Sequence, residues 1–136
     1  MSINSWKKEY YKGRLRDAAR TPLSAAEHSL TKWRGLRAGA LQDHGLVEDC
    51  MDIRNPDTDS VFLINSDTCA LCALALKSGS LDCDNCALQL STAYGCGDHD
   101  SGWYAWERRS DPELMIQQLE HTVMWLKLKG VKDGHP

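Results

Sequence analysis

The sequence predicts an α+β fold: a small single domain with a helical hairpin, short antiparallel strands and a long C-terminal helix. Amphipathic patterns with start and stop signals indicate helices within residues 21–45 and 111–130, and short apolar runs broken by turn residues lie between them. The chain has 136 residues, a length typical of one domain. With 42% hydrophobic and 26% charged residues, its composition is that of a globular protein.

Residues 1–20 predict a basic, aromatic N-terminal arm or a short strand. They show no clean hydrophobic period, and Trp6, Tyr10 and Tyr11 lie among lysines and arginines. Up to Arg37 the chain holds nine basic and three acidic residues, whereas the whole chain has a net charge of −3. This polarity is typical of a surface that docks on nucleic acid or on an acidic protein, and also of a solvated segment.

The helical hairpin is predicted from its start and stop signals. Pro22 in the first turn and a capping-box pattern indicate the start of a helix over about 24–34. Apolar residues recur on one face of this helix until Gly35. A second short helix, over about 37–44, ends before Gly45.

Short antiparallel strands are predicted over 51–53 and 61–64. Both runs are largely apolar, and Asn, Pro and Asp within 55–59 favour a turn between them. The aromatic run at 103–106 indicates an edge strand or a loop packed on the cysteine segment, residues 69–96.

The C-terminal helix is predicted over about 112–129. Pro112 and Glu113 suit the first turn of a helix, and lysines and Gly130 suit its end. The apolar residues that recur every three or four positions are Ile116, Leu119, Val123 and Leu126.

The most specific motif is a doubled C-x2-C. Cys69 and Cys72 form one pair, Cys83 and Cys86 the other, with ten residues between the pairs. Zinc takes four tetrahedral ligands, and a two-residue spacer lets one tight turn aim two thiolates at the metal. The spacing therefore predicts Zn²⁺ held by these four cysteines, with Cys96 as an alternative ligand.

A zinc ion closed by four thiolates is structural, because it has no open coordination position for a substrate. Its net charge near −2 requires partial compensation by backbone amides, Lys77 or another donor. Buried cysteines, a redox pair and disulfides are the alternatives, and the usual spacing of an iron–sulfur cluster is absent. The fold prediction thus becomes a small zinc-stapled α+β domain.

The sequence carries the equipment of no common enzyme class. It has no glycine-rich phosphate loop, nucleophile elbow, HExxH motif or paired helical carboxylates. The remaining catalytic hypothesis uses Cys96, Asp98 and His99 at an unfilled metal position. We therefore predict a protein that is not an enzyme.

Motifs along most of the chain carry a family resemblance. They are residues 5–11 (SWKKEYY), residues 27–36 (EHSLTKWRGL), Asp43-His44-Gly45, the two C-x2-C pairs, Gly95-Cys96, Met115-Ile116 and Leu119-Glu120. With these motifs the chain resembles small proteins encoded by bacteriophages and prophages that have paired CxxC motifs. The resemblance implies a viral origin and a metal-stapled body.

The expected function is that of a phage-encoded, zinc-binding, non-enzymatic protein in the host cytoplasm. It binds, and inhibits, a host protein such as a defence or replication factor. The alternative is a zinc-dependent nucleic-acid-binding protein that uses the basic N-terminal arm. No membrane partner is expected, because the longest apolar runs are far below the roughly 18 residues of a spanning helix. The expected partner-binding residues are Trp6, Tyr10, Arg14, Arg16, Trp103 and Tyr104.

Overall fold

The structure is a computed structural model that describes residues 2–49, 51–65, 68–77, 87–92, 102–109 and 111–132. It is an α+β fold with a small three-stranded antiparallel sheet and a long C-terminal helix, as predicted. Its elements, in chain order, are α1 (Ile3–Tyr10), α2 (Leu15–Ala18), α3 (Pro22–Arg34), α4 (Ala38–Asp43), β1 (Val47–Asp49), β2 (Asp52–Arg54), β3 (Val61–Leu63), α5 (Ala70–Lys77), α6 (Ala87–Thr92), α7 (Gly102–Arg109) and α8 (Glu113–Lys132).

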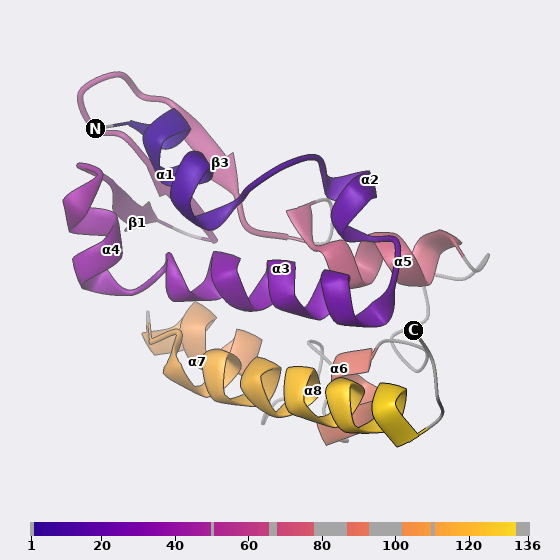
Figure 1. Ribbon diagram of the computed structural model, residues 1–136. Coiled ribbons are helices and arrows are strands. Elements are labelled where there is room, and N and C mark those ends of the chain that lie inside the picture. Colours follow the sequence, from indigo (N-terminus) through magenta and orange to yellow (C-terminus); the bar gives the residue numbers. More distant parts are fainter. Residues whose placement is uncertain are drawn as a thin grey trace.

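Helix α3 lies between two layers of the molecule. Figure 1 shows α1, α2, α5 and the sheet on one side of α3, and α8 with α6 and α7 on the other. Ion pairs join Arg34 to Glu120 and Arg37 to Glu113. Because residues farther along α3 pair with residues earlier in α8, these two helices are antiparallel. α3 therefore has one face on α5 and another on α8.

The N-terminal residues form helices instead of the predicted arm or strand. A capping box starts α1, in which the Ser5 N–H donates to Ser2 Oγ at 3.1 Å and the Ser2 N–H donates to Ser5 Oγ at 2.9 Å. Ile3, Trp6 and Tyr10 recur at helical spacing and pack into or against the core. The lysines between them obscured this period in the sequence.

The predicted helical hairpin is present as α3 and α4. The N-cap of α3 is Thr21, and Ser24 completes a capping box with it, so the helix starts two residues before the predicted position. Ser24 is thus the third helical residue instead of the cap. Gly35 ends α3, as predicted.

The sheet has the order β1-β2-β3, with one strand more than predicted. Its register places Glu48, Ile53 and Phe62 opposite one another, and Ile53 is fully buried. Side chains of paired residues share one face of a sheet, so this row faces the core. Met51, predicted as a strand residue, lies in the β1–β2 turn with a φ of 67°.

The aromatic run at 103–106 is helical, so the expectation of a strand or loop is wrong. It lies within α7, whose Trp106 is buried and meets Trp33 of α3 edge to face, with ring centroids 5.2 Å apart. Gly102 allows this packing, because a Cβ there would lie 2.3 Å from the Met115 backbone. Trp103 and Trp106 are three residues apart, which is a helical spacing.

Helix α8 confirms the predicted C-terminal helix. The Glu113 N–H donates to Asp111 Oδ1 at 3.0 Å at its start, and its core face carries the predicted Ile116, Leu119 and Val123. Across the described residues, no helix combines the length and apolar character needed to cross a membrane.

Candidate functional site

The first C-x2-C pair lies at the N-terminus of α5. Cys69 directly precedes the helix, and the backbone N–H of Cys72 donates to Cys69 Sγ at 3.4 Å. Both side chains are partly buried. A sulfur that accepts an N–H at a helix N-terminus is favoured as a thiolate, since the helix dipole stabilises negative charge there.

Helix α3 places polar side chains against Cys69. The Ser29 hydroxyl lies 3.9 Å from Cys69 Sγ. One turn later, Lys32 Nζ donates to the Thr68 carbonyl at 3.3 Å, and Tyr11 Oη donates to the same carbonyl at 3.1 Å. Lys32 is 2% exposed. A hydroxyl, an ammonium and a phenol therefore converge on the chain at the start of α5.

These neighbours stabilise negative charge on Cys69. Its pKa lies well below the usual value, mainly because of the hydrogen bond with the Cys72 side chain, with further contributions from the Lys32 charge, the Cys72 N–H and Ser29. Burial acts in the opposite direction but does not prevail. The pKa of Tyr11 is raised to about 12 by burial and by the charge of Cys69.

His28 lies on the same side of α3. Its ring packs edge to face on Tyr11, with centroids 4.6 Å apart, and neither ring nitrogen has a hydrogen-bond partner in the described part of the chain. Burial, followed by the nearby Lys32 charge, lowers its pKa. His28 is thus a partly buried, neutral residue instead of the surface residue that its neighbour Glu27 indicated.

The chemistry of this pair fits zinc. Two thiols held at one helix turn, with a lowered pKa at Cys69, provide half of the predicted ligand set. The predicted ligands Cys83, Cys86 and Cys96 lie outside the described residues. Within those residues, no three His, Cys, Asp or Glu side chains gather as a metal site.

The compensating cation near Cys69 is one that the sequence reasoning missed. Lys77 was the named candidate, and its side chain is not among those described. Lys32 lies seven residues after Ala25 and three after Ser29, both buried residues of α3. A lysine on the buried stripe of an amphipathic helix was the available signal.

The predicted partner-binding residues do not form one exposed surface. Arg14 and Arg16 are exposed on and beside α2, whereas Tyr10 and Trp103 are partly buried and pack against the core. The Tyr104 side chain is not among those described.

Trp6 is a core residue, which corrects its assignment to partner binding. It is fully buried, its Nε1–H donates to the Gly35 carbonyl at 2.8 Å, and its ring contacts Phe62 with centroids 5.5 Å apart. Gly35 is required for this approach, because a Cβ there would lie 2.5 Å from the Tyr10 ring.

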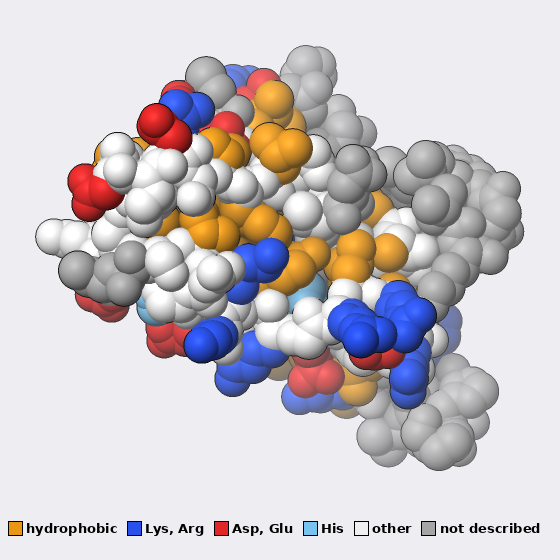
Figure 2. Space-filling view, turned by 90° about the horizontal axis from the view of Figure 1, so that it is seen from above, with side chains coloured by type: hydrophobic (Ala, Val, Ile, Leu, Met, Phe, Trp, Pro, Cys, Tyr) orange, Lys and Arg blue, Asp and Glu red, His pale blue; other side chains and the backbone are white. Residues whose placement is uncertain are grey.

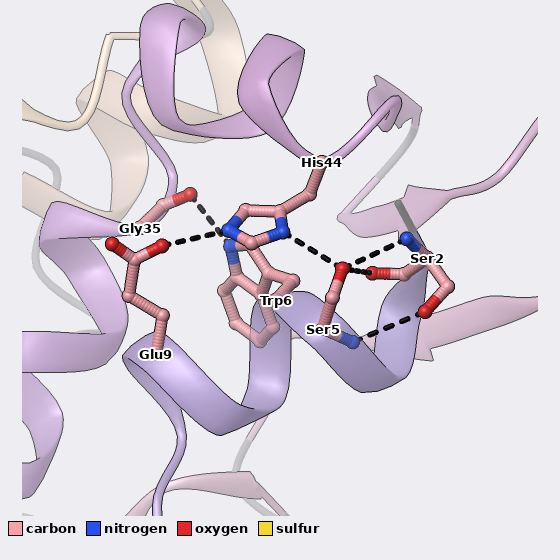
Figure 3. A network of polar contacts seen from close by, with 6 residues as sticks. All are labelled: Ser2, Ser5, Trp6, Glu9, Gly35 and His44. Atoms are coloured by element: carbon pink, nitrogen blue, oxygen red, sulfur yellow. Dashed lines mark hydrogen bonds and ion pairs between the residues drawn. The ribbon is translucent and has the colours of Figure 1, made fainter.

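A serine, a histidine and a glutamate form a second polar cluster that the sequence did not predict (Figure 3). Ser5 Oγ lies 2.8 Å from His44 Nδ1, and His44 Nε2 lies 2.8 Å from Glu9 Oε1. These side-chain types also form the triad of serine hydrolases. Here, however, Ser5 Oγ already takes part in the capping box with Ser2. We interpret the cluster as a structural connection between α1 and the end of α4.

Two hollows on the described surface lie away from these clusters. One, of about 410 Å³, runs between α3 and α8 and is lined by Glu27, Leu30, Thr31, Arg34, Glu120, Val123, Met124, Lys127 and Leu128. The other, of about 520 Å³, is lined by Asn4, Lys7, Lys8, Tyr11, Lys12 and Gly13. Neither includes Ser5 or His44, so neither offers that cluster a substrate-binding cavity.

Comparison with protein-family models, with curated proteins and with solved structures finds no match in any of the three. The function is therefore argued from the residues and their geometry.

Proposed function

We propose that the chain is a phage-encoded, zinc-binding, non-enzymatic protein that binds and inhibits a host protein, such as a defence or replication factor, in the host cytoplasm. The observation that carries the zinc part is the pair Cys69 and Cys72, held at one helix turn beside the buried Lys32. The motifs shared with phage and prophage proteins support the viral origin.

The zinc is structural in this proposal. Cys69 and Cys72 supply two thiolates, and Cys83 and Cys86 supply the others, with Cys96 as the alternative. Such a site leaves the metal no position for a substrate, which supports a non-enzymatic role. Its binding free energy contributes to folding, because the unfolded chain offers no preformed site.

Metal analysis tests the zinc site directly. Protein purified without added metal is expected to contain about one zinc per chain, and four of the six cysteines are expected to become reactive only after chelation. Cys69→Ser and Cys83→Ser are expected to lose zinc and melt at lower temperature, whereas Cys50→Ser, outside the ligand set, is the matched control. No metal, with thiols already oxidised, would contradict the site.

The groove between α3 and α8 supports the binding part of the proposal. Met124 and Leu128 line it with 63% and 67% of their surface exposed. Glu27 and Lys127 line it with opposite charges and form no ion pair with each other. An apolar floor with charges of both signs suits an amphipathic helix of a partner protein, which places apolar residues at helical spacing in such a groove.

Variants on two surfaces test this assignment. A host protein captured by the wild-type chain is purified, and its Kd is measured for the Met124→Lys/Leu128→Lys double variant. Both side chains are exposed, so folding is expected to be retained, while affinity is expected to fall at least about tenfold as the buried apolar contact is lost. Val47→Lys/Val61→Lys, at exposed sheet positions, is the control. Equal affinity of both double variants would rule out the groove.

Nucleic-acid binding is the second candidate, favoured by the hollow beside α1. Lys7, Lys8 and Lys12 line it and no carboxylate does. Lys7 is held over the Phe62 ring, with its Nζ 5.1 Å from the ring centroid. Seen from the α1 side, lysine and arginine side chains flank a band of hydrophobic ones (Figure 2). Such a surface can contact phosphates without reading bases.

Salt-dependent binding distinguishes the two candidates. If nucleic acid is the partner, a labelled DNA duplex binds at low salt and Lys8→Glu/Lys12→Glu weakens it at least about tenfold, with a shallower salt dependence of about 0.9 per lost phosphate contact. Lys127→Glu/Lys129→Glu on α8 is the control. Absence of binding to duplex and to single strands at low salt would remove this candidate.

A further inference from the structure

Lys32 is a charged side chain in an apolar place. It lies in α3 with only 2% of its surface exposed, and its Nζ donates one hydrogen bond, to the Thr68 carbonyl. The same carbonyl also accepts from Tyr11. Burying an ammonium is costly unless an opposite charge or a full set of acceptors compensates it. A single shared carbonyl at 3.3 Å does neither.

The surroundings of Lys32 contain no carboxylate partner. No Asp or Glu in the described part of the chain lies within ion-pair distance of it, and the Trp33 ring, with its centroid 5.9 Å from Nζ, is the only aromatic face recorded near it there. Its acceptor Thr68 directly precedes Cys69, and Ser29, one turn earlier on α3, contacts Cys69 Sγ. The thiols of the C-x2-C pair are therefore the anionic groups that this geometry offers to Lys32.

We propose that Lys32 is the built-in counter-charge of the metal–thiolate centre formed by Cys69 and Cys72 with the remaining cysteine ligands. This inference rests on the proposed zinc site. Four thiolates around Zn²⁺ carry a net charge near −2, and a buried ammonium offsets one unit of it where water cannot. Lys32 itself is not a ligand, because its ammonium has donors and no free acceptor. It is a positioning residue that acts on the metal through Cys69.

This role makes a prediction of opposite signs. Lys32→Met keeps the length of the side chain and removes the charge. The metal-free protein is then expected to be as stable as the wild type or more stable, because a desolvated ammonium is gone. Zinc binding is expected to be weaker, because the thiolates lose their counter-charge. A lysine needed only for packing would lower stability without a separate effect on zinc affinity.

The experiment measures both quantities on the full chain. Zinc affinity is determined by competition with a chromophoric chelator, and the urea midpoint is measured in EDTA. For Lys32→Met we expect zinc affinity to fall at least about tenfold with an unchanged or higher midpoint. Lys8→Met, at an exposed position, is expected to change neither. Lys32→Arg, which keeps the charge, is expected to retain more of the affinity than Lys32→Met, and Lys32→Gln replaces Lys32→Met if that variant does not fold.

Each outcome decides one proposal. If the wild type binds zinc and the uncharged variant binds it equally well, the counter-charge role is wrong and the zinc site stands. A variant with lower stability in EDTA and unchanged affinity makes Lys32 a packing residue. If the wild type binds no zinc, the zinc proposal fails and this inference fails with it.

Discussion

The two faces of α3 differ in what they bury. The face toward α8 is apolar: Leu30 is buried, and Trp33 packs edge to face on Trp106. Its charged residues, Arg34 and Arg37, lie at the rim and form exposed ion pairs with α8. The face toward α5 instead buries polar side chains, which are Ser29, Lys32 and part of His28.

The contrast separates stability from function. Apolar burial on the α8 side stabilises the fold at roughly 25 cal/mol per Å² and requires no partners. Polar burial on the α5 side carries a desolvation cost, which each group must offset through a specific contact. Ser29 has Cys69 and Lys32 has a single carbonyl. A face that retains such groups is where a binding site is expected.

The largest effect is expected on the apolar face. Trp33→Ala removes a side chain that is 2% exposed and leaves a cavity beside Trp106, so the free energy of unfolding should fall by about 3–5 kcal/mol. Urea denaturation measures it. Trp125→Ala is the control, because that ring is partly exposed and carries Lys129 on its face. Equal losses in the two variants would mean that the α3–α8 core is not the main source of stability.

A methyl group tests how closely the apolar side is packed. Gly102→Ala places a Cβ against the Met115 backbone, so α7 must move from α8 at a cost of about 1–3 kcal/mol. Gly39→Ala is the matched control, since nothing lies within 4 Å of a Cβ there, and alanine in helix α4 should stabilise by about 0.5–1 kcal/mol. The two urea midpoints should shift in opposite directions. A shift in the same direction would contradict the close α7–α8 contact.

On the polar face, a smaller and pH-dependent effect is expected from His28. Its pKa is lowered in the folded state, so as pH falls through the ordinary value of about 6.5 the unfolded chain takes up the proton first. Folding stability therefore decreases toward low pH. His28→Phe keeps a ring on Tyr11 and cannot titrate, so its stability relative to the wild type should rise between pH 7 and pH 5.

Urea midpoints of the two proteins in a chelator at both pH values measure this difference. Other histidines contribute equally to both proteins and cancel. A relative stability that is the same at pH 7 and pH 5 would show that His28 takes up its proton equally in the folded and unfolded states.

The smallest effect is expected at the rim of the apolar face. Arg37 contacts both carboxylate oxygens of Glu113, at 2.8 and 3.0 Å, but both side chains are 47% exposed. Arg37→Met should therefore cost about 0.2–1 kcal/mol, and less in high salt. The double-mutant cycle with Glu113→Gln isolates the pair. A coupling energy above that of Gly102→Ala would place this ion pair among the main stabilising contacts.

The sequence by itself determined the local features of this protein. Capping residues, Pro22 and Gly35 located the ends of α3, and the period of three to four apolar residues located α8, because these signals act between residues a few positions apart. The spacing of Cys69 and Cys72 likewise fixed their place on one turn. The helix of residues 3–10 was missed, because the lysines in it masked a short apolar stripe.

Only the tertiary structure decided which side chains are buried and which meet. Trp6 became a core residue through Gly35 and Phe62, Lys32 reached a carbonyl 36 residues away, and Ser5 met a histidine 39 residues away. No local pattern specifies such pairs, because they depend on how helices far apart in the sequence pack together. The charge beside Cys69 is therefore a property of the packed α3–α5 interface, whereas the thiol pair is a property of the sequence.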